Sequence, residues 1–256
     1  MSCVFPGKKN IIPAQYEMMG SPLQEVEHHP YLGVELDNKL SWGNQIDQCT
    51  SKAHKTLNFL RRNMYSCPRE TKEMAYKSLV RPLIEYGGSA WDSGQVGRIK
   101  QVEMVQRKAA RFVLGEWRQT ESVTAMLEKL KWQSLQERRS VRRLVLLYQA
   151  HHRLFAITIP SYVNIASQPS LRRHPIQYLA IPTRTSTYAD SYWPRTIQSW
   201  NSLPTATVIK KTAEAFKDSL TRDISAGRLG IVVRRSARIL SPAARQELGS
   251  NTVSLF

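Results

Sequence analysis

Arginine residues form the densest cluster of chemically active side chains in this sequence. Four of them fall within six residues of one expected helix, namely Arg138, Arg139, Arg142 and Arg143. Spacings of three and four residues put side chains on neighbouring positions of a helix face, where like charges repel each other. A bound polyanion would relieve that repulsion, so the cluster is our first candidate for a phosphate-binding site. The alternatives are a solvated helix face or ion pairs with Glu128 and Glu137.

Two other expected helices carry basic side chains mostly outside their apolar stripes. The first helix holds Lys52, Lys55, Arg61 and Arg62, and the second holds Arg107, Lys108 and Arg111. A solvated face explains the first set about as well as a binding role does. Because phosphate contacts carry no information about the bases, binding by these groups would be weakly selective for sequence and strongly dependent on salt.

Complete catalytic or metal-binding sets are not recognisable in the sequence. The pairs His28-His29 and His151-His152 are adjacent residues, which point to different sides of a strand or helix, so neither pair chelates a metal well. Cys3, Cys49 and Cys67 are widely spaced and predict reduced structural thiols of an intracellular protein. We therefore expect no catalytic residues and no metal site.

Net charge rises after the first forty residues. The chain carries +17 with a pI near 10.1, but residues 1–40 carry −2, residues 41–160 carry +11 and residues 161–256 carry +8. Such localised positive charge is typical of a binding site for a polyanion. The sequence has no run of about 18 uncharged apolar residues, the length that a membrane span needs. Nucleic acid is therefore the expected partner, and a membrane is not.

The first forty residues predict a small β region. Ala14–Met19 and Leu23–Glu27 flank a turn signal at Gly20–Pro22, and Tyr31–Leu36 alternates as a third strand. Three short strands make at best a fragment of a sheet. We therefore interpret residues 1–40 as the remnant of a larger sheet.

From Ser41 onward the apolar residues recur at helical spacing. The first stripe comprises Ile46, Cys49, Ala53, Leu57, Leu60 and Met64. A second helix begins at Pro68, with Pro82 kinking or ending it, and its expected apolar face comprises Met74, Ala75, Leu79 and Leu83. Further helices are expected at Val96–Leu114, Ser122–Leu130 and Leu135–Phe155. Four tryptophans scattered among these helices are expected in cores or caps, although an exposed one could stack on a base: Trp42, Trp91, Trp117 and Trp132.

The remainder of the chain has less regular patterning. Residues 156–226 combine several prolines with serine and threonine, and predict a long irregular connection followed by one helix at Thr212–Ile224. Residues 227–256 form an arginine-rich tail that we expect to be loosely ordered. The predicted protein is mainly α-helical, with regions 1–40, 41–155, 156–226 and 227–256.

A series of short blocks resembles one known family. Tyr31–Asp37 with Leu40–Trp42 resembles the block that closes the palm of non-LTR retrotransposon reverse transcriptases. Later blocks resemble the same family in the same order: Lys52–Lys55, Leu60–Asn63, Ala75–Tyr86, Val105–Val113, Leu130–Arg139 and Trp193–Pro204. The ordered series is most similar to jockey-like elements.

The resemblance implies that the chain corresponds to the part that follows the polymerase active site. Tyr31, Leu32 and Gly33 would then lie in the primer grip, where glycine lets the backbone approach a sugar-phosphate chain. The basic helices from Ser41 onward would form the thumb, which holds a template–primer duplex by its phosphates. For the Trp193–Pro204 block we expect only a capping or folding role.

Polymerase chemistry in this family requires aspartates of a Tyr/Phe-Ala-Asp-Asp turn that hold Mg²⁺. Tyr188–Ser191 has serine in place of the second aspartate and follows the primer-grip block instead of preceding it, so we interpret the match as a coincidence. The resemblance therefore implies an intracellular chain, nuclear or cytoplasmic, that binds template–primer without sequence preference. It would have no catalysis or cofactor of its own, Mg²⁺ belonging to the full-length polymerase. The alternative is an inert or protein-interaction helical remnant.

Overall fold

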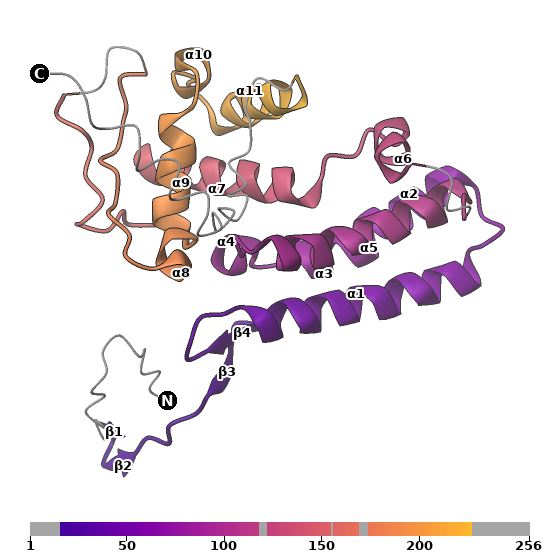
Figure 1. The fold of residues 1–256 in the computed structure, drawn as a ribbon, viewed down its shortest axis with the longest axis horizontal. Helices are drawn as coiled ribbons and strands as arrows, with labels where there is room; N and C mark the ends of the chain where they lie inside the picture. The colour runs from indigo at the N-terminus through magenta and orange to yellow at the C-terminus, as the bar shows by residue number, and fades with distance from the viewer. Residues whose placement is uncertain (1–15, 118–121, 155, 169–173, 227–256) are drawn as a thin grey trace, which may run out of the picture.

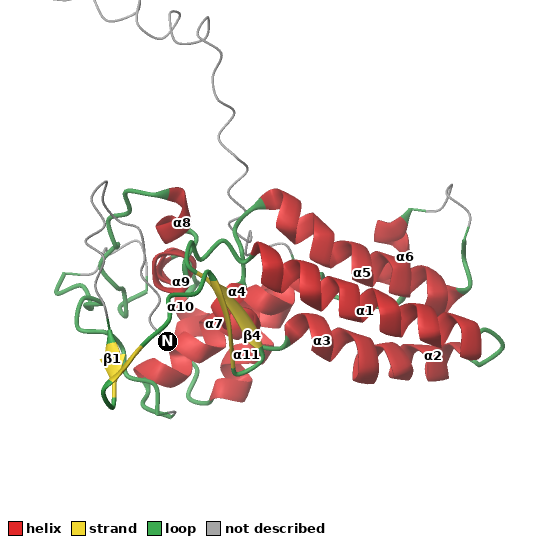
Figure 2. Cartoon of the chain, turned by 90° about the horizontal axis from the view of Figure 1, so that it is seen from below, coloured by secondary structure: helices red, strands yellow, loops and turns green. Residues whose placement is uncertain are grey.

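The computed structural model of this chain describes residues 16–117, 122–154, 156–168 and 174–226. These residues form a mainly helical protein with two small β-hairpins at the N-terminal side, which confirms the predicted fold class (Figures 1 and 2). None of the described helices is long and apolar enough to cross a membrane. The predicted arginine-rich tail at 227–256 lies outside the described residues.

The N-terminal β region consists of two separate antiparallel hairpins. Strand β1 (Glu17–Met18) pairs with β2 (Ser21–Pro22), and β3 (His28–Tyr31) pairs with β4 (Val34–Asp37). The predicted continuous strand Tyr31–Leu36 is wrong, because Leu32 and Gly33 form a two-residue turn inside it. Both turn residues have positive φ, 48° and 78°, as the tight turns that match strand twist require. The predicted strand Leu23–Glu27 is not a strand, and Met19-Gly20, not Gly20–Pro22, makes the other turn.

Two long helices that run in the same direction form the centre of the first helical unit. Helix α1 (Gly43–Asn63) and α5 (Val96–Leu114) pack along their lengths (Figure 2). The predicted stripe of α1 is buried from Ile46 to Leu60, and Met64 packs against it from the helix end. The predicted bounds of α5 are also confirmed. So is the inward face that its apolar spacing predicts, which comprises Ile99, Val102, Val105, Ala109, Phe112 and Val113. Both predictions succeeded because apolar periodicity over five turns or so fixes one face of a helix.

The second predicted helix is divided into three pieces. Helix α2 (Arg69–Ala75) leads into a π-helical turn η1 (Tyr76–Val80) and then α3 (Arg81–Glu85). The predicted inward positions Met74 and Leu79 are 70% and 52% exposed, whereas Ala75 is buried and Leu83 packs against the core as predicted. The extra residue of the π turn changes which side chains from Tyr76 onward face the core, but Met74 precedes that turn and lies beside the buried face. A different set is fully buried: Tyr76, Val80 and Ile84. The π turn ends two residues before Pro82, whose nitrogen cannot donate a helical hydrogen bond.

The remaining helices complete the first helical unit and form the C-terminal half. Short helices α4 (Gly88–Trp91) and α6 (Val123–Lys129) precede and follow α5, and α7 (Leu135–His151) begins with a capping box between Ser134 and Glu137. Helix α7 ends before the predicted Phe155, because the chain turns at Arg153 with φ 53°. The irregular segment predicted after it contains α8 (Ser186–Ala189), α9 (Tyr192–Asn201) and α10 (Thr205–Val208). The last predicted helix is confirmed as α11 (Ala213–Ser225).

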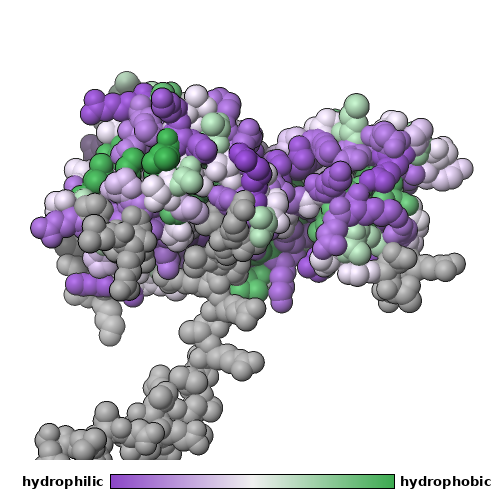
Figure 3. Space-filling model, turned by 90° about the horizontal axis from the view of Figure 1, so that it is seen from above, coloured by the Kyte–Doolittle hydropathy of each residue, from purple (hydrophilic) through white to green (hydrophobic). Residues whose placement is uncertain are grey.

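Two hydrophobic cores lie in two lobes of the molecule. The first core joins α1 to α6 and reaches Leu135, and the second joins α7, α9, α10 and α11 around Trp200 and Phe216. The space-filling surface narrows between the lobes, and most of it is hydrophilic (Figure 3). Helix α7 contributes to both cores, so the division between them falls inside α7, whereas the sequence suggested a boundary after residue 155.

Candidate nucleic-acid interface

Two of the clustered arginines on α7 are buried. The side chains of Arg139 and Arg143 are each 3% exposed, and both pair with Asp92, which follows α4 and is also 3% exposed. The Nε of Arg139 donates to Oδ1 of Asp92 at 2.9 Å. Neither guanidinium therefore faces the solvent from which a phosphate would approach.

A third arginine from a distant helix completes this buried cluster. Nη1 of Arg195, on α9, donates to the Asp92 backbone oxygen at 3.0 Å and lies 3.3 Å from its carboxylate Oδ2. Burial, together with the charge of Arg195, lowers the pKa of Arg143 to about 9. Burial likewise lowers the pKa of Arg195 to about 10, so both side chains remain protonated at neutral pH. The Asp92 carboxylate thus compensates three guanidinium groups, and these contacts connect α7 and α9 with the residue that follows α4.

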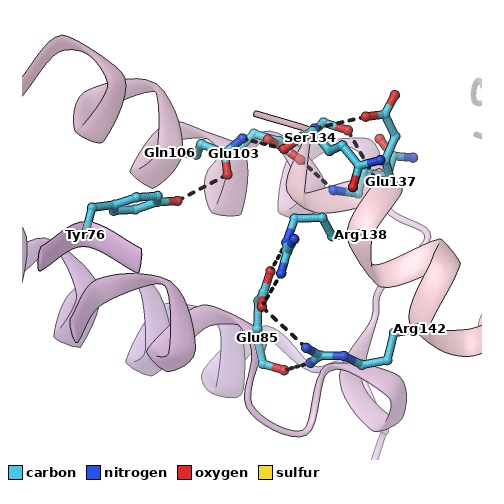
Figure 4. Close-up of polar contacts among 10 residues, drawn as sticks. Tyr76, Glu85, Glu103, Gln106, Ser134, Glu137, Arg138 and Arg142 are labelled. Carbon is cyan, nitrogen blue, oxygen red and sulfur yellow. Dashed lines mark hydrogen bonds and ion pairs between the residues drawn. The ribbon is translucent and has the colours of Figure 1, made fainter. Parts of the chain in front are cut away.

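The other two arginines of the cluster share Glu85 at the end of α3 (Figure 4). Arg138 forms a two-nitrogen contact with the carboxylate, and Nη1 of Arg142 donates to the Glu85 backbone oxygen at 2.8 Å. Burial alone would raise the pKa of Glu85, but the hydrogen bond and charge of Arg138, with the charge of Arg142, lower it below its ordinary value. Arg142 keeps about half of its side chain exposed.

The structure therefore corrects the premise behind the arginine cluster. Its mutual repulsion is relieved by two carboxylates of the same chain, Glu85 and Asp92, and not by an external polyanion alone. The partners considered from sequence, Glu128 and Glu137, form no ion pair with these arginines, and Glu137 instead caps the start of α7. Only Arg142 and part of Arg138 remain accessible to a ligand.

The basic side chains on α1, in contrast to the buried arginines on α7, lie at the surface. Lys52, Lys55, Arg61 and Arg62 are all exposed. None of them forms an ion pair with another described residue. Spacings of three and seven residues bring Lys52, Lys55 and Arg62 to one outward side of the helix, opposite the buried stripe.

Helix α5 extends the same basic surface. Arg107 and Lys108 are exposed and Arg111 is half-buried, and again no ion pair with a described residue involves them. Burial and then the charge of Lys108 lower the pKa of His54, a residue of α1. The charge of Lys108 thus reaches α1, against which α5 packs. We call these seven residues the α1–α5 basic surface.

The predicted primer-grip residues lie at the tip of the second hairpin. Tyr31 and Leu32 are 60% and 75% exposed, and Gly33 completes the turn. The hydroxyl of Tyr86 donates to the Leu32 backbone oxygen at 2.7 Å, which ties the tip to the end of α3. A Cβ on Gly33 would lie 3.3 Å from the Tyr86 ring, so the close approach and the positive φ both favour glycine.

Sequence reasoning missed three residues that organise this region: Glu85, Asp92 and Arg195. Each is a single charged residue beside apolar neighbours, with no local spacing that indicates a partner. The Trp193–Pro204 block was expected to have a capping or folding role, and Arg195 within it makes the buried contacts with Asp92. A charged residue inside an aromatic, otherwise buried block was the available signal.

The remaining candidates from the sequence are the metal-ligating side chains, the cysteines and the tryptophans. No group of three or more His, Cys, Asp or Glu side chains that could hold a metal occurs in the described part of the chain. Burial raises the pKa of the Cys49 thiol to about 11, as expected for a structural cysteine. Trp91 is buried, Trp132 stacks on Tyr76 with ring centroids 4.6 Å apart, and Trp117 is half exposed.

Comparisons of the chain with protein-family models, with curated protein sequences and with solved structures find no match.

Proposed function

We propose that this chain corresponds to the primer-grip, thumb and post-thumb part of a jockey-like non-LTR retrotransposon reverse transcriptase, and that it binds an RNA–DNA hybrid or duplex by its phosphates. The ordered series of sequence blocks supports the family. A β-hairpin followed by a basic helical bundle is compatible with the primer-grip and thumb regions that the blocks imply. The proposed activity is passive binding, without polymerisation, and Mg²⁺ would act only in a full-length polymerase.

The observation that carries the binding proposal is the α1–α5 basic surface. Its cations are exposed or half-buried, lie on two helices that pack against each other and form no ion pair with a described residue. Solvated cations without internal partners release the counterions of a nucleic acid when they bind its phosphates. The α7 arginines contribute less than the sequence suggested, because Asp92 and Glu85 already neutralise them.

Fluorescence anisotropy with a labelled RNA–DNA hybrid at several salt concentrations tests the proposal. The test variant replaces four members of the basic surface with glutamine: Lys52, Lys55, Arg62 and Arg107. The matched control removes the same number of lysines and arginines from exposed positions elsewhere: Arg153, Arg184, Lys211 and Lys217. Each lost phosphate contact lowers the slope of log K against log salt by about 0.9.

The expected result is weaker binding and a shallower salt slope for the test variant, with the control close to wild type. Absence of salt-dependent binding by the wild-type chain, or an equal loss in both variants, would contradict the proposal. Primer extension with added Mg²⁺ is expected to give no product.

One observation favours a second candidate, a protein-interaction role. The hairpins expose large apolar side chains, with Met18, Met19 and Leu32 at 62%, 99% and 75%. Two-stranded hairpins also leave open edges that pair readily with other chains. Size-exclusion chromatography of nuclease-treated protein discriminates between the candidates, since self-association that persists without nucleic acid supports this role and a monomer counts against it.

A further inference from the structure

Exposed aromatic and basic side chains meet at one end of the first lobe. This end is formed by the C-terminal ends of α1 and α5 and the start of α2, with α6 beside them (Figure 1). We define the end surface by five residues: Arg61, Tyr65, Arg69, Trp117 and Lys129. They come from four different segments of the chain.

Trp117 is the aromatic centre of this end surface. It is 50% exposed and is the one exposed tryptophan in the described residues. The Arg61 guanidinium lies over its ring, 4.3 Å from the centroid. The cation therefore lies directly beside a large exposed π surface. Single-stranded nucleic acid binds such an arrangement by stacking a base on the ring while the adjoining phosphate pairs with the cation.

The surroundings of Trp117 are held in place and are mostly basic. Arg69 donates to the Lys129 backbone oxygen at 3.2 Å, and the Lys129 ammonium pairs with Glu116 at 3.1 Å. Glu116 directly precedes Trp117, so these contacts link the segment that carries the ring to α2 and α6. Tyr65 adds a second aromatic ring, 78% exposed, next to the end of α1.

The α1–α5 basic surface and the end surface differ in chemistry. The former presents cations along two helices, which fits the regular phosphates of a duplex. The end surface adds an exposed indole, which a paired base inside a duplex cannot reach. We infer that the end surface binds unpaired nucleotides of a single strand, with a base stacked on Trp117 and its phosphate near Arg61. This inference rests on the proposed nucleic-acid binding but names another ligand and another site, which shares Arg61 with the α1–α5 basic surface.

Paired anisotropy titrations with a labelled single-stranded polypyrimidine and a blunt RNA–DNA hybrid of equal length test the inference. Trp117→Ala removes the ring, Trp117→Phe keeps a smaller one, and Tyr162→Ala is the matched control, an exposed aromatic in the other lobe. Stacking on an aromatic ring contributes about 1–3 kcal/mol per base, so Trp117→Ala should raise the single-strand Kd by about 5- to 150-fold. Its affinity for the hybrid should stay unchanged.

Intrinsic fluorescence supplies a readout that a structural role would not move. Titrating unlabelled single strand should quench tryptophan emission of the wild type and of Tyr162→Ala, and the Trp117→Phe variant should lose that quenching. Its Kd should lie between those of wild type and Trp117→Ala. Unchanged single-strand binding by Trp117→Ala, or equal losses for single strand and hybrid, overturns the inference alone. A wild-type chain that binds neither probe overturns the inference and the proposed function together.

Discussion

Replacing Asp92 by asparagine removes the one negative charge that Arg139, Arg143 and Arg195 share. The substitution keeps the shape of the side chain and one acceptor oxygen. It replaces the other oxygen with an NH2 group, which is a donor and cannot accept hydrogen bonds from the guanidinium groups. All four side chains are 8% exposed or less, so water cannot replace the lost charge without opening the structure.

The expected loss of stability is large. Removing one partner of a buried ion pair costs about 3–5 kcal/mol, because the other charge is left uncompensated. For a chain of this size, 1 kcal/mol corresponds to about 2–4 °C in the midpoint of thermal unfolding, so Asp92→Asn should lower that midpoint by about 6–20 °C. Circular dichroism at neutral pH measures the shift.

A matched control comes from the same substitution at a solvated ion pair. Asp47 pairs with Arg98 at 2.8 Å, but the Asp47 side chain is 53% exposed. Exposed pairs contribute about 0–1 kcal/mol, so Asp47→Asn should shift the unfolding midpoint only slightly. Adding Arg143→Met to Asp92→Asn should restore part of the lost stability, since it removes an unpaired buried charge. Equal effects of Asp92→Asn and Asp47→Asn, or no recovery in the double variant, would refute this reasoning.

Two further pairs of substitutions test the packing and the electrostatics of the first lobe. Gly87→Ala should lower the unfolding midpoint, because the residue has φ 63° and a Cβ there would lie 2.8 Å from Val34. The control Gly97→Ala adds a Cβ to α5 where no atom lies within 4 Å, so it should leave the midpoint unchanged or raise it. Destabilisation of both variants to the same extent in thermal unfolding would contradict this. Glu85→Gln should lower the free energy of unfolding at neutral pH, because the lowered pKa of Glu85 contributes stability that is present above the unfolded pKa of about 4.3 and lost as the pH falls through the folded value. Burial raises the pKa of Glu103 despite a hydrogen bond from the Gln136 backbone amide. The free energy of unfolding of the wild type therefore falls as the pH rises from the unfolded to the folded pKa of Glu103. Over that pH range Glu103→Gln should become more stable relative to the wild type. Urea unfolding across a pH series should therefore show pH trends of opposite sign for Glu85→Gln and Glu103→Gln, and trends of the same sign would count against the assignment.

Local patterning determined a large part of the fold. The bounds of α5, the buried stripe of α1 and the last helix follow from apolar periodicity that neighbouring residues impose on a helix. Periodicity failed at the π turn before Pro82, because one extra residue in a turn changes which side chains face the core. It also failed at Leu32-Gly33, where a non-glycine residue adopts positive φ in a hairpin turn.

The candidate interface was only partly predictable, and the α7 arginines show why. The sequence by itself determined that α7 carries four arginines within six residues and that the chain is strongly basic. Only the tertiary structure decided that Arg139 and Arg143 point inward, because their partner Asp92 lies 47 residues before Arg139 and Glu85 lies 53 residues before Arg138. The spacing of charged residues on a helix does not show which of their side chains will be buried, because that depends on where a carboxylate from another element lies. The same folding left the seven cations of the α1–α5 basic surface without an ion pair among the described residues, and there the sequence's positive charge remains available at the surface.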